Sequence, residues 1–170
     1  MILLRHTRPE VGEGICYGRS DLDLRADFEA ASREVLARLP PVRRVVSSPL
    51  GRCRHLAQRI AACRGLALAV DPRLAEMDFG TWEGRAWSAI ARAELDAWAA
   101  DFHHARPHGG ESVAMLAARV DAALGTVEPG RPPVLWVSHA GVARAAAAHL
   151  GCARGWETRL GFGDWLDLSG

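Results

Sequence analysis

The chain has 170 residues, of which 49% are hydrophobic, and its formal net charge at pH 7 is +1. This length suits one domain with one sizeable core, and the near-neutral charge excludes a surface that is basic enough overall to bind nucleic acid or an anionic membrane. All 21 basic residues are arginines. The absence of lysine excludes a Walker-A phosphate loop and a Schiff-base lysine. Any chemistry on anions must therefore come from a local cluster of arginines.

The first half of the chain predicts strands that alternate with helices. The predicted elements are a strand at 2–4, a helix at 26–39, a strand at 42–47, a helix from 48 to about 64 and a strand at 66–70. Ser48 as N-cap and Pro49 as the first helical residue mark the start of the second helix. Gly65 marks its end. The regular alternation favours a parallel sheet, because each crossover needs a helix.

The second half is less regular at first and then resumes the alternation. The predicted elements are a loop at 74–84, a helix at 87–100, a loop at 102–110, a helix at 111–126, a buried strand at 134–137, a helix at 142–150 and a strand near 165–168. We therefore expect an α/β fold with three α/β/α layers and a mostly parallel sheet flanked by helices. A single domain is expected over 1–170, with a helical and loop lid over about 71–112.

The cysteines and the N-terminus bear on the cellular compartment. Cys16, Cys53, Cys63 and Cys152 form no Cys-x-x-Cys pair, so we expect free thiols in a reducing environment. Only four residues precede Arg5, which leaves no room for a signal peptide, and no apolar run approaches the ~20 residues that span a bilayer. We expect a cytoplasmic protein.

Polar residues follow three of the predicted strands. Arg5 and His6 follow the first strand, Arg52 lies in the first turn of the next helix, and His139 follows the strand at 134–137. Ligands of open α/β sheets bind just outside the carboxyl ends of strands, and a helix N-terminus favours an anion. The planar arginine fork binds phosphate oxygens in pairs. Each residue alone also fits a surface turn, a strand end or a solvated helix, but together they predict a phosphate site.

Five segments in this order resemble the histidine phosphatase superfamily, in the branch that contains the phosphoglycerate mutases. The segments are Arg5-His6-Thr7, which is similar to the Arg-His-Gly signature of that family, then 47–53, 75–84, 109–112 and Ser138-His139-Ala140-Gly141. The resemblance covers essentially the whole chain. It implies a phosphoglycerate mutase-like fold and hydrolysis of a phosphomonoester through a phosphohistidine, with no cofactor and no metal.

The resemblance also implies a role for each site residue. His6 is the expected nucleophile, and Arg5, Arg52 and His139 are expected to hold the phosphoryl oxygens. Glu76 is the expected general acid, which protonates the leaving alkoxide and then activates water.

Two sets of residues leave alternatives open. Asp78 and Glu83 lie near Glu76 in the sequence and remain alternatives for the acid. His103, His104 and His108 invite a metal-site interpretation, but no carboxylate or cysteine stands at ligand spacing from them. We expect these three histidines to lie on the lid over the pocket.

Three short patterns narrow the resemblance. Arg-His-Thr-x-Pro, Cys-Tyr-Gly and Asp-Phe-Gly-x-Trp-Glu-Gly are together most similar to the α-ribazole phosphatases of cobalamin biosynthesis. Gly12 stands where mutases carry an asparagine, which weakens the alternative of a phosphoglycerate-type mutase. Another small phosphomonoester, or a phosphate-ester binding module without turnover, remain further alternatives. The expected partner is a small phosphomonoester, with no nucleic acid or membrane, and a homodimer stays open. The expected substrate contacts are Thr7, Arg8, Tyr17, Gly18, Arg19 and Ser138.

Overall fold

The computed structural model describes residues 1–128 and 132–168, and its centre is a sheet of five strands in the order β3-β2-β4-β1-β5. The strands are β1 (Ile2–Arg5), β2 (Arg44–Ser47), β3 (Leu68–Val70), β4 (Val134–Ser138) and β5 (Trp165–Asp167). Strands β1, β2, β3 and β4 pair in parallel, whereas β5 pairs with β1 in the antiparallel direction. The expectation of a mostly parallel sheet is confirmed.

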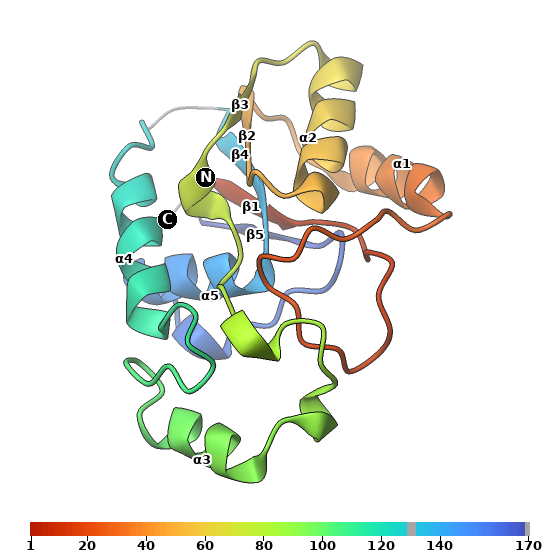
Figure 1. The fold of residues 1–170 in the computed structure, drawn as a ribbon. Helices are drawn as coiled ribbons and strands as arrows, with labels where there is room; N and C mark the ends of the chain where they lie inside the picture. The colour runs from red at the N-terminus through yellow and green to blue at the C-terminus, as the bar shows by residue number, and fades with distance from the viewer. Residues whose placement is uncertain (129–131, 169–170) are drawn as a thin grey trace.

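Helices cover both faces of this sheet (Figure 1). Helices α1 (Phe28–Arg38) and α2 (Gly51–Arg64) lie on one side, and α4 (Val113–Leu124) and α5 (Ala140–His149) on the other. Successive strand side chains point to opposite faces. In β1, Ile2 and Leu4 accordingly belong to the core under α1 and α2, and Leu3 belongs to the core under α4 and α5. The predicted three-layer α/β/α architecture is confirmed.

The register of the three neighbouring strands determines where the polar residues emerge. Arg5 of β1 lies opposite Ser138 of β4, and Ser47 of β2 lies opposite Val137 of the same strand. Because these strands are parallel and end almost level, the residues that follow them meet at one edge of the sheet. His6, Arg52 and His139 therefore come together although they are far apart in the sequence.

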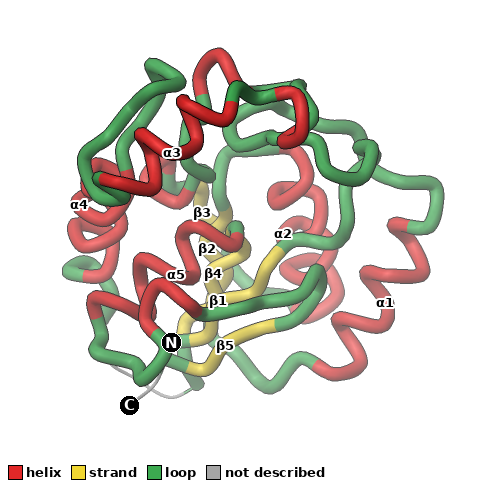
Figure 2. The backbone as a smooth tube through the Cα atoms, turned by 90° about the horizontal axis from the view of Figure 1, so that it is seen from below, coloured by secondary structure: helices red, strands yellow, loops and turns green. Residues whose placement is uncertain are grey.

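The segment at 71–112, which the sequence predicts as a lid, contributes no strand to the sheet. It consists of short turns and one helix (Figure 2). Its elements are 3-10 turns at Pro72–Leu74, Gly80–Trp82 and Trp87–Ala89 and helix α3 (Arg92–Ala100). The prediction of one helix over 87–100 is wrong, because Ile90 and Ala91 are extended. Ile90 is buried against Trp82 and Cys16, and this contact interrupts the alanine-rich stretch.

Helix α2 begins later than the sequence predicts. Its first residue is Gly51 and its N-cap is Leu50, which makes no side-chain cap. The prediction of Ser48 as N-cap is wrong, because Leu50 is extended with ψ 139° and the helix starts only after it, although the Ser48 hydroxyl accepts a 3.3 Å bond from the N–H of Leu50 as well as contacting His139. The predicted end of the helix is confirmed, since Gly65 adopts the left-handed conformation with φ 62°.

Two further features concern the chain as a whole. None of the helices within 1–128 and 132–168 is long and apolar enough to cross a membrane. All four cysteines are free thiols: Cys16 and Cys53 are buried, and Cys63 and Cys152 are exposed.

Candidate active site

His6 follows β1 and is buried, with one ring nitrogen fixed by its own backbone. Its Nδ1 lies 2.7 Å from the carbonyl oxygen of Thr7. Because a carbonyl only accepts, Nδ1 carries the proton and donates, which leaves the lone pair of Nε2 free of a proton. Burial and the neighbouring Arg52 lower the pKa of His6 to about 3. The ring is therefore neutral at physiological pH, as a nucleophilic imidazole must be.

Arg52 is fully buried and joins the two site histidines. Its Nε lies 3.3 Å from Nε2 of His6, and its Nη2 lies 3.4 Å from Nδ1 of His139. The carbonyl oxygens of Ser20 and Gly18 accept further bonds of 2.7 and 2.6 Å from the same guanidinium. No carboxylate pairs with Arg52 in the part of the chain that the structure describes. A buried cation without a counter-ion is costly, so this geometry favours an anion beside it.

His139 lies between β4 and α5 and is the N-cap of that helix. Its Nε2 lies 2.8 Å from the hydroxyl oxygen of Ser48. Since Arg52 only donates to Nδ1, the proton of a neutral His139 lies on Nε2 and is donated to Ser48. Burial lowers the pKa of His139, and the nearby His6 and Arg52 lower it further. The His6 and His139 rings meet edge to face, with centroids 5.1 Å apart.

Arg5 lies at the end of β1 and is fixed by the C-terminal segment. Its Nη1 donates to the carbonyl oxygen of Leu160 at 2.7 Å, and its guanidinium carbon lies 3.7 Å from the ring centroid of Phe162. Two buried polar atoms here have no hydrogen-bond partner within the described residues, namely Nε of Arg5 and the hydroxyl of Thr7. Both are donors that a phosphate oxygen would satisfy. No motif of the sequence indicates a role for Phe162, whose contact with Arg5 is seen only in the folded structure.

Glu76 lies just after the 3-10 turn at Pro72–Leu74, and its side chain contacts the first turn of α5. Its Oε2 accepts a 3.0 Å bond from the backbone N–H of Gly141, and its Oε1 accepts a 2.9 Å bond from that of Met77. A Cβ at position 141 would overlap Oε1 of Glu76. The close approach of this carboxylate to the first turn of α5 therefore requires glycine at position 141.

An ion pair that the sequence analysis did not predict holds the segment of Glu76. Arg119 of α4 bonds both carboxylate oxygens of Glu111, at 2.7 and 2.8 Å. The same guanidinium donates to the carbonyl oxygens of Ala75 and Glu76 at 2.6 and 3.1 Å. The side chains of Arg119 and Glu111 are only 15% and 10% exposed. This pair anchors the backbone on which Glu76 stands, but an arginine eight residues after a glutamate gives no local sign of it.

The two alternative acids are engaged in local structure. Oδ1 of Asp78 accepts a 2.8 Å bond from the N–H of Gly80. Glu83 accepts bonds from the backbone N–H groups of Arg19, Ser20 and Phe79. Burial alone would raise the pKa of Glu83, but these bonds and one from the Ser20 hydroxyl outweigh it and lower the pKa. Glu83 is thus an ionised anchor for the loop at 18–20.

Some of the expected substrate contacts lie beside the phosphate-binding residues. Burial raises the pKa of the Tyr17 hydroxyl and the positive charges of Arg5 and Arg52 oppose this shift; the Arg52 guanidinium carbon lies 5.4 Å from the Tyr17 ring centroid. Gly18 is buried so closely against the carbonyl of Met77 that no side chain fits there. Thr7 is buried beside His6, as described above.

Other expected contacts lie further out or face away. Arg8 and Arg19 are exposed, and the Arg8 guanidinium carbon is 5.5 Å from the ring centroid of Phe162. The side chain of Ser138, the last of the expected substrate contacts, faces away from these residues. This side chain is fully buried, and its hydroxyl donates to the carbonyl oxygen of Leu74 at 2.8 Å.

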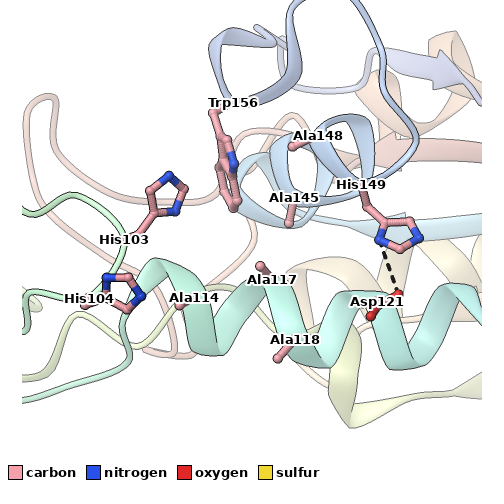
Figure 3. A pocket seen from close by; sticks show the side chains of 10 residues that line it. All are labelled: His103, His104, Ala114, Ala117, Ala118, Asp121, Ala145, Ala148, His149 and Trp156. Carbon is pink, nitrogen blue, oxygen red and sulfur yellow. Dashed lines mark ion pairs between the residues drawn. The ribbon is translucent and has the colours of Figure 1, made fainter.

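The three histidines that were expected over the pocket do not lie together. His108 is buried and contacts Trp82 with ring centroids 4.8 Å apart. His103 and His104 instead line a groove between α4 and α5, together with Trp156 (Figure 3). No group of three or more potential metal ligands occurs within 1–128 and 132–168.

Comparison with known proteins agrees with this geometry. The profile of the histidine phosphatase superfamily (branch 1) matches residues 1–161. A glucosyl-3-phosphoglycerate phosphatase of Mycobacterium tuberculosis is 33% identical over an alignment that covers 100% of this chain and 85% of the relative. An adenosylcobalamin/alpha-ribazole phosphatase of Salmonella typhimurium is 29% identical and covers 96% of this chain and 86% of its own.

Solved structures show the same relationship. The alpha-ribazole phosphatase of Shigella flexneri superimposes with a TM-score of 0.83 at 27% identity, over 96% of this chain and 87% of that one. The shared fold, the match of the family profile along nearly the whole sequence and the phosphatase names of the relatives agree. The chain therefore belongs to the histidine phosphatase superfamily (branch 1) and is a phosphoric monoester hydrolase.

Proposed function

We propose that His6 forms a phosphohistidine during the hydrolysis of a small phosphomonoester. The lone pair of its Nε2 attacks phosphorus, the P–O bond to the alcohol breaks, and the leaving oxygen takes a proton from Glu76. Water then attacks phosphorus and gives a proton to the Glu76 carboxylate. The P–N bond breaks, and inorganic phosphate and neutral His6 result. The observation that carries this proposal is the buried, unpaired Arg52 between two neutral histidines.

The cationic and polar groups around His6 have a shared role in this proposal. Arg5, Arg52 and His139 hold the equatorial oxygens and stabilise the charge of a loose transition state. The dianion replaces His6 Nε2 as the acceptor for Arg52 and supplies a partner for Nε of Arg5. The N-terminus of α5, which starts beside His139, adds its dipole to this environment.

For the organic half of the substrate we propose α-ribazole 5′-phosphate, with a place in cobalamin biosynthesis. The Cys16-Tyr17-Gly18 pattern and the likeness to the Shigella flexneri enzyme support this choice. A second candidate is glucosyl-3-phosphoglycerate, which the identity of 33% to the mycobacterial phosphatase favours. A panel that contains both esters and an aryl phosphate discriminates between them. Release of phosphate from none of the three esters would overturn the proposed hydrolysis.

The proposed intermediate has its own test. We expect His6→Ala to abolish turnover and the acid-labile labelling of the protein by a ³²P-labelled substrate. His104→Ala is the matched control, because this side chain is 75% exposed and lies in the groove between α4 and α5. Undiminished turnover in His6→Ala would remove His6 from the mechanism. Transfer of phosphate within the substrate, without free phosphate, would instead indicate a mutase, and tight binding without turnover would indicate a binding module.

A further inference from the structure

The C-terminal segment around Gly163 is hydrogen-bonded to the end of β1, next to the nucleophile. The N–H of Gly163 lies 3.1 Å from the carbonyl oxygen of Arg5 and 3.2 Å from that of His6. In return, the N–H of Arg5 donates to the carbonyl oxygen of Asp164 at 3.0 Å. Gly163 adopts φ 72°, a conformation that other residues rarely reach. These backbone bonds fix the position of the preceding residue, Phe162, relative to the phosphate-binding end of β1.

The ring of Phe162 contacts three side chains at this edge of the sheet. The guanidinium carbon of Arg5 lies 3.7 Å from the ring centroid, and that of the exposed Arg8 lies 5.5 Å from it. The ring of His6 is 5.5 Å away, measured between centroids. A cation over an aromatic face is attracted by the ring quadrupole, and more strongly where water is excluded. Burial lowers the pKa of Arg5, so the shorter contact is also the one that is better shielded from water.

Two contacts from this C-terminal segment restrain the guanidinium of Arg5. Its Nη1 donates to the carbonyl oxygen of Leu160 at 2.7 Å, and the guanidinium carbon lies over the ring of Phe162. A guanidinium held by the hydrogen bond alone could still rotate about that bond, whereas a planar group that also packs on a ring face has a preferred plane. The buried Nε of Arg5 has no hydrogen-bond partner among the described residues. The two restraints thus leave one donor that is held in place and not used by the protein.

We propose that Phe162 is a positioning residue, which holds the Arg5 guanidinium in the orientation that binds the phosphoryl group. This inference rests on the proposed role of Arg5 in holding phosphoryl oxygens. An arginine whose plane is already fixed loses less conformational freedom when phosphate binds, and its donors stay aligned as charge develops in the transition state. An aliphatic side chain could fill a similar volume, but it has neither a flat face nor a quadrupole. The role therefore needs an aromatic ring at position 162.

A double-mutant cycle on Phe162 and Arg5 tests this role, with kcat/KM for p-nitrophenyl phosphate as the measurement. We expect Phe162→Leu to lower kcat/KM about five- to thirtyfold when Arg5 is present. In Arg5→Gln, the same substitution should lower it by less than about twofold, because the group that the ring orients is gone. Phe162→Tyr keeps the ring and should stay within about twofold of the wild type. Phe102→Leu is the matched control, since this ring is 38% exposed and contacts Trp98 and Trp156 instead.

Calorimetric binding of inorganic phosphate gives a second readout that needs no turnover. Phe162→Leu should weaken this binding while its circular dichroism matches that of the wild type, and unchanged binding would overturn the inference. A loss of kcat/KM that is equal with and without Arg5 would also overturn it, because the ring would then act on folding or on His6. The same holds if Phe162→Tyr is as impaired as Phe162→Leu. Unchanged kcat/KM in Arg5→Gln alone would overturn the proposed role of Arg5 itself and the inference with it, so the two failures are distinguished.

Discussion

At the scale of single residues, the site contains a buried positive charge, that of Arg52, with which no carboxylate pairs among the described residues. Arg52 is fully buried, its nearest titratable neighbours are His6 and His139, and both rings are kept neutral by their lowered pKa values. Protonation of either ring would place two cations in contact without an anion. The same field that keeps His6 unprotonated also attracts a dianion, so one arrangement prepares the nucleophile and binds its target.

The role of Glu76 as general acid gives a prediction that depends on the leaving group. An alkoxide needs a proton when the P–O bond breaks, whereas a nitrophenolate leaves without one. We expect Glu76→Gln to lower kcat/KM for an alkyl phosphate about 10²- to 10⁴-fold and to affect p-nitrophenyl phosphate much less. Asp78→Asn is the comparison, and steady-state kinetics on both esters is the measurement. A leaving-group-dependent loss in Asp78→Asn instead would transfer the role to that residue.

How much of the site the sequence predicts differs from residue to residue. Arg5, His6, Arg52 and His139 are predictable because each lies at the end of a strand or in the segment or first helical turn that follows it, and parallel strands bring such residues to one edge. Phe162 and the Arg119–Glu111 pair are not predictable, because their contacts depend on how the C-terminal segment and α4 pack. The same holds for the inward direction of Ser138, which only the completed fold determines.

At the scale of elements, the first turn of α5 positions both His139 and Glu76. Gly141 donates its N–H to the Glu76 carboxylate and leaves no room for a methyl group. An added Cβ at this position would also lie 3.3 Å from Cδ2 of Leu116 in α4, so it has a second close neighbour besides Glu76. A site that joins two elements through one glycine should be sensitive to one added carbon.

We therefore expect Gly141→Ala to fold and yet to lose kcat/KM for alkyl phosphates by about tenfold to a hundredfold, because Glu76 is displaced. Position 141 is helical, so alanine is compatible with the backbone there. Gly125→Ala is the matched control, because an added Cβ at the end of α4 meets nothing closer than 3.8 Å. Circular dichroism would verify folding in both variants. Wild-type kinetics in Gly141→Ala would show that the Glu76 contact does not matter.

The elements themselves are predictable to the extent that local signals agree with tertiary contacts. Gly65 ends α2 as its sequence predicts, because its left-handed conformation is a local property of glycine and nothing lies within 4 Å of where its Cβ would be. Ser48 is not the N-cap of that helix, because Leu50 is extended, and its hydroxyl contacts both His139 and the N–H of Leu50. The stretch at 87–100 breaks where Ile90 enters the aromatic cluster with Trp82. The antiparallel direction of β5 likewise depends on its pairing with β1, which no local pattern encodes.

At the scale of the whole molecule, the site occupies the edge where all three layers meet. Strands β2, β4 and β1 supply the floor, α2 and α5 contribute their N-terminal turns, and the segment at 71–112 brings Glu76. His6 and His139, which lie at this edge, are buried within the folded domain. The cost of that burial is therefore part of the folding equilibrium, and pH should act on stability through it.

His6 has a pKa of about 3 in the folded chain against 6.5 for a free histidine, and the pKa of His139 is lowered in the same direction. Between pH 6.5 and 3, the unfolded chain binds protons that the folded chain does not. The free energy of unfolding should thus be greatest above pH 6.5 and should fall with decreasing pH by about 1.4 kcal/mol per pH unit for each such histidine. Urea unfolding at pH 7.5 and 5.0 measures this loss. His6→Asn keeps a donor for the Thr7 carbonyl but cannot titrate, so its loss should be smaller than that of the wild type. An equal loss in both proteins would mean that His6 is not held neutral by the fold.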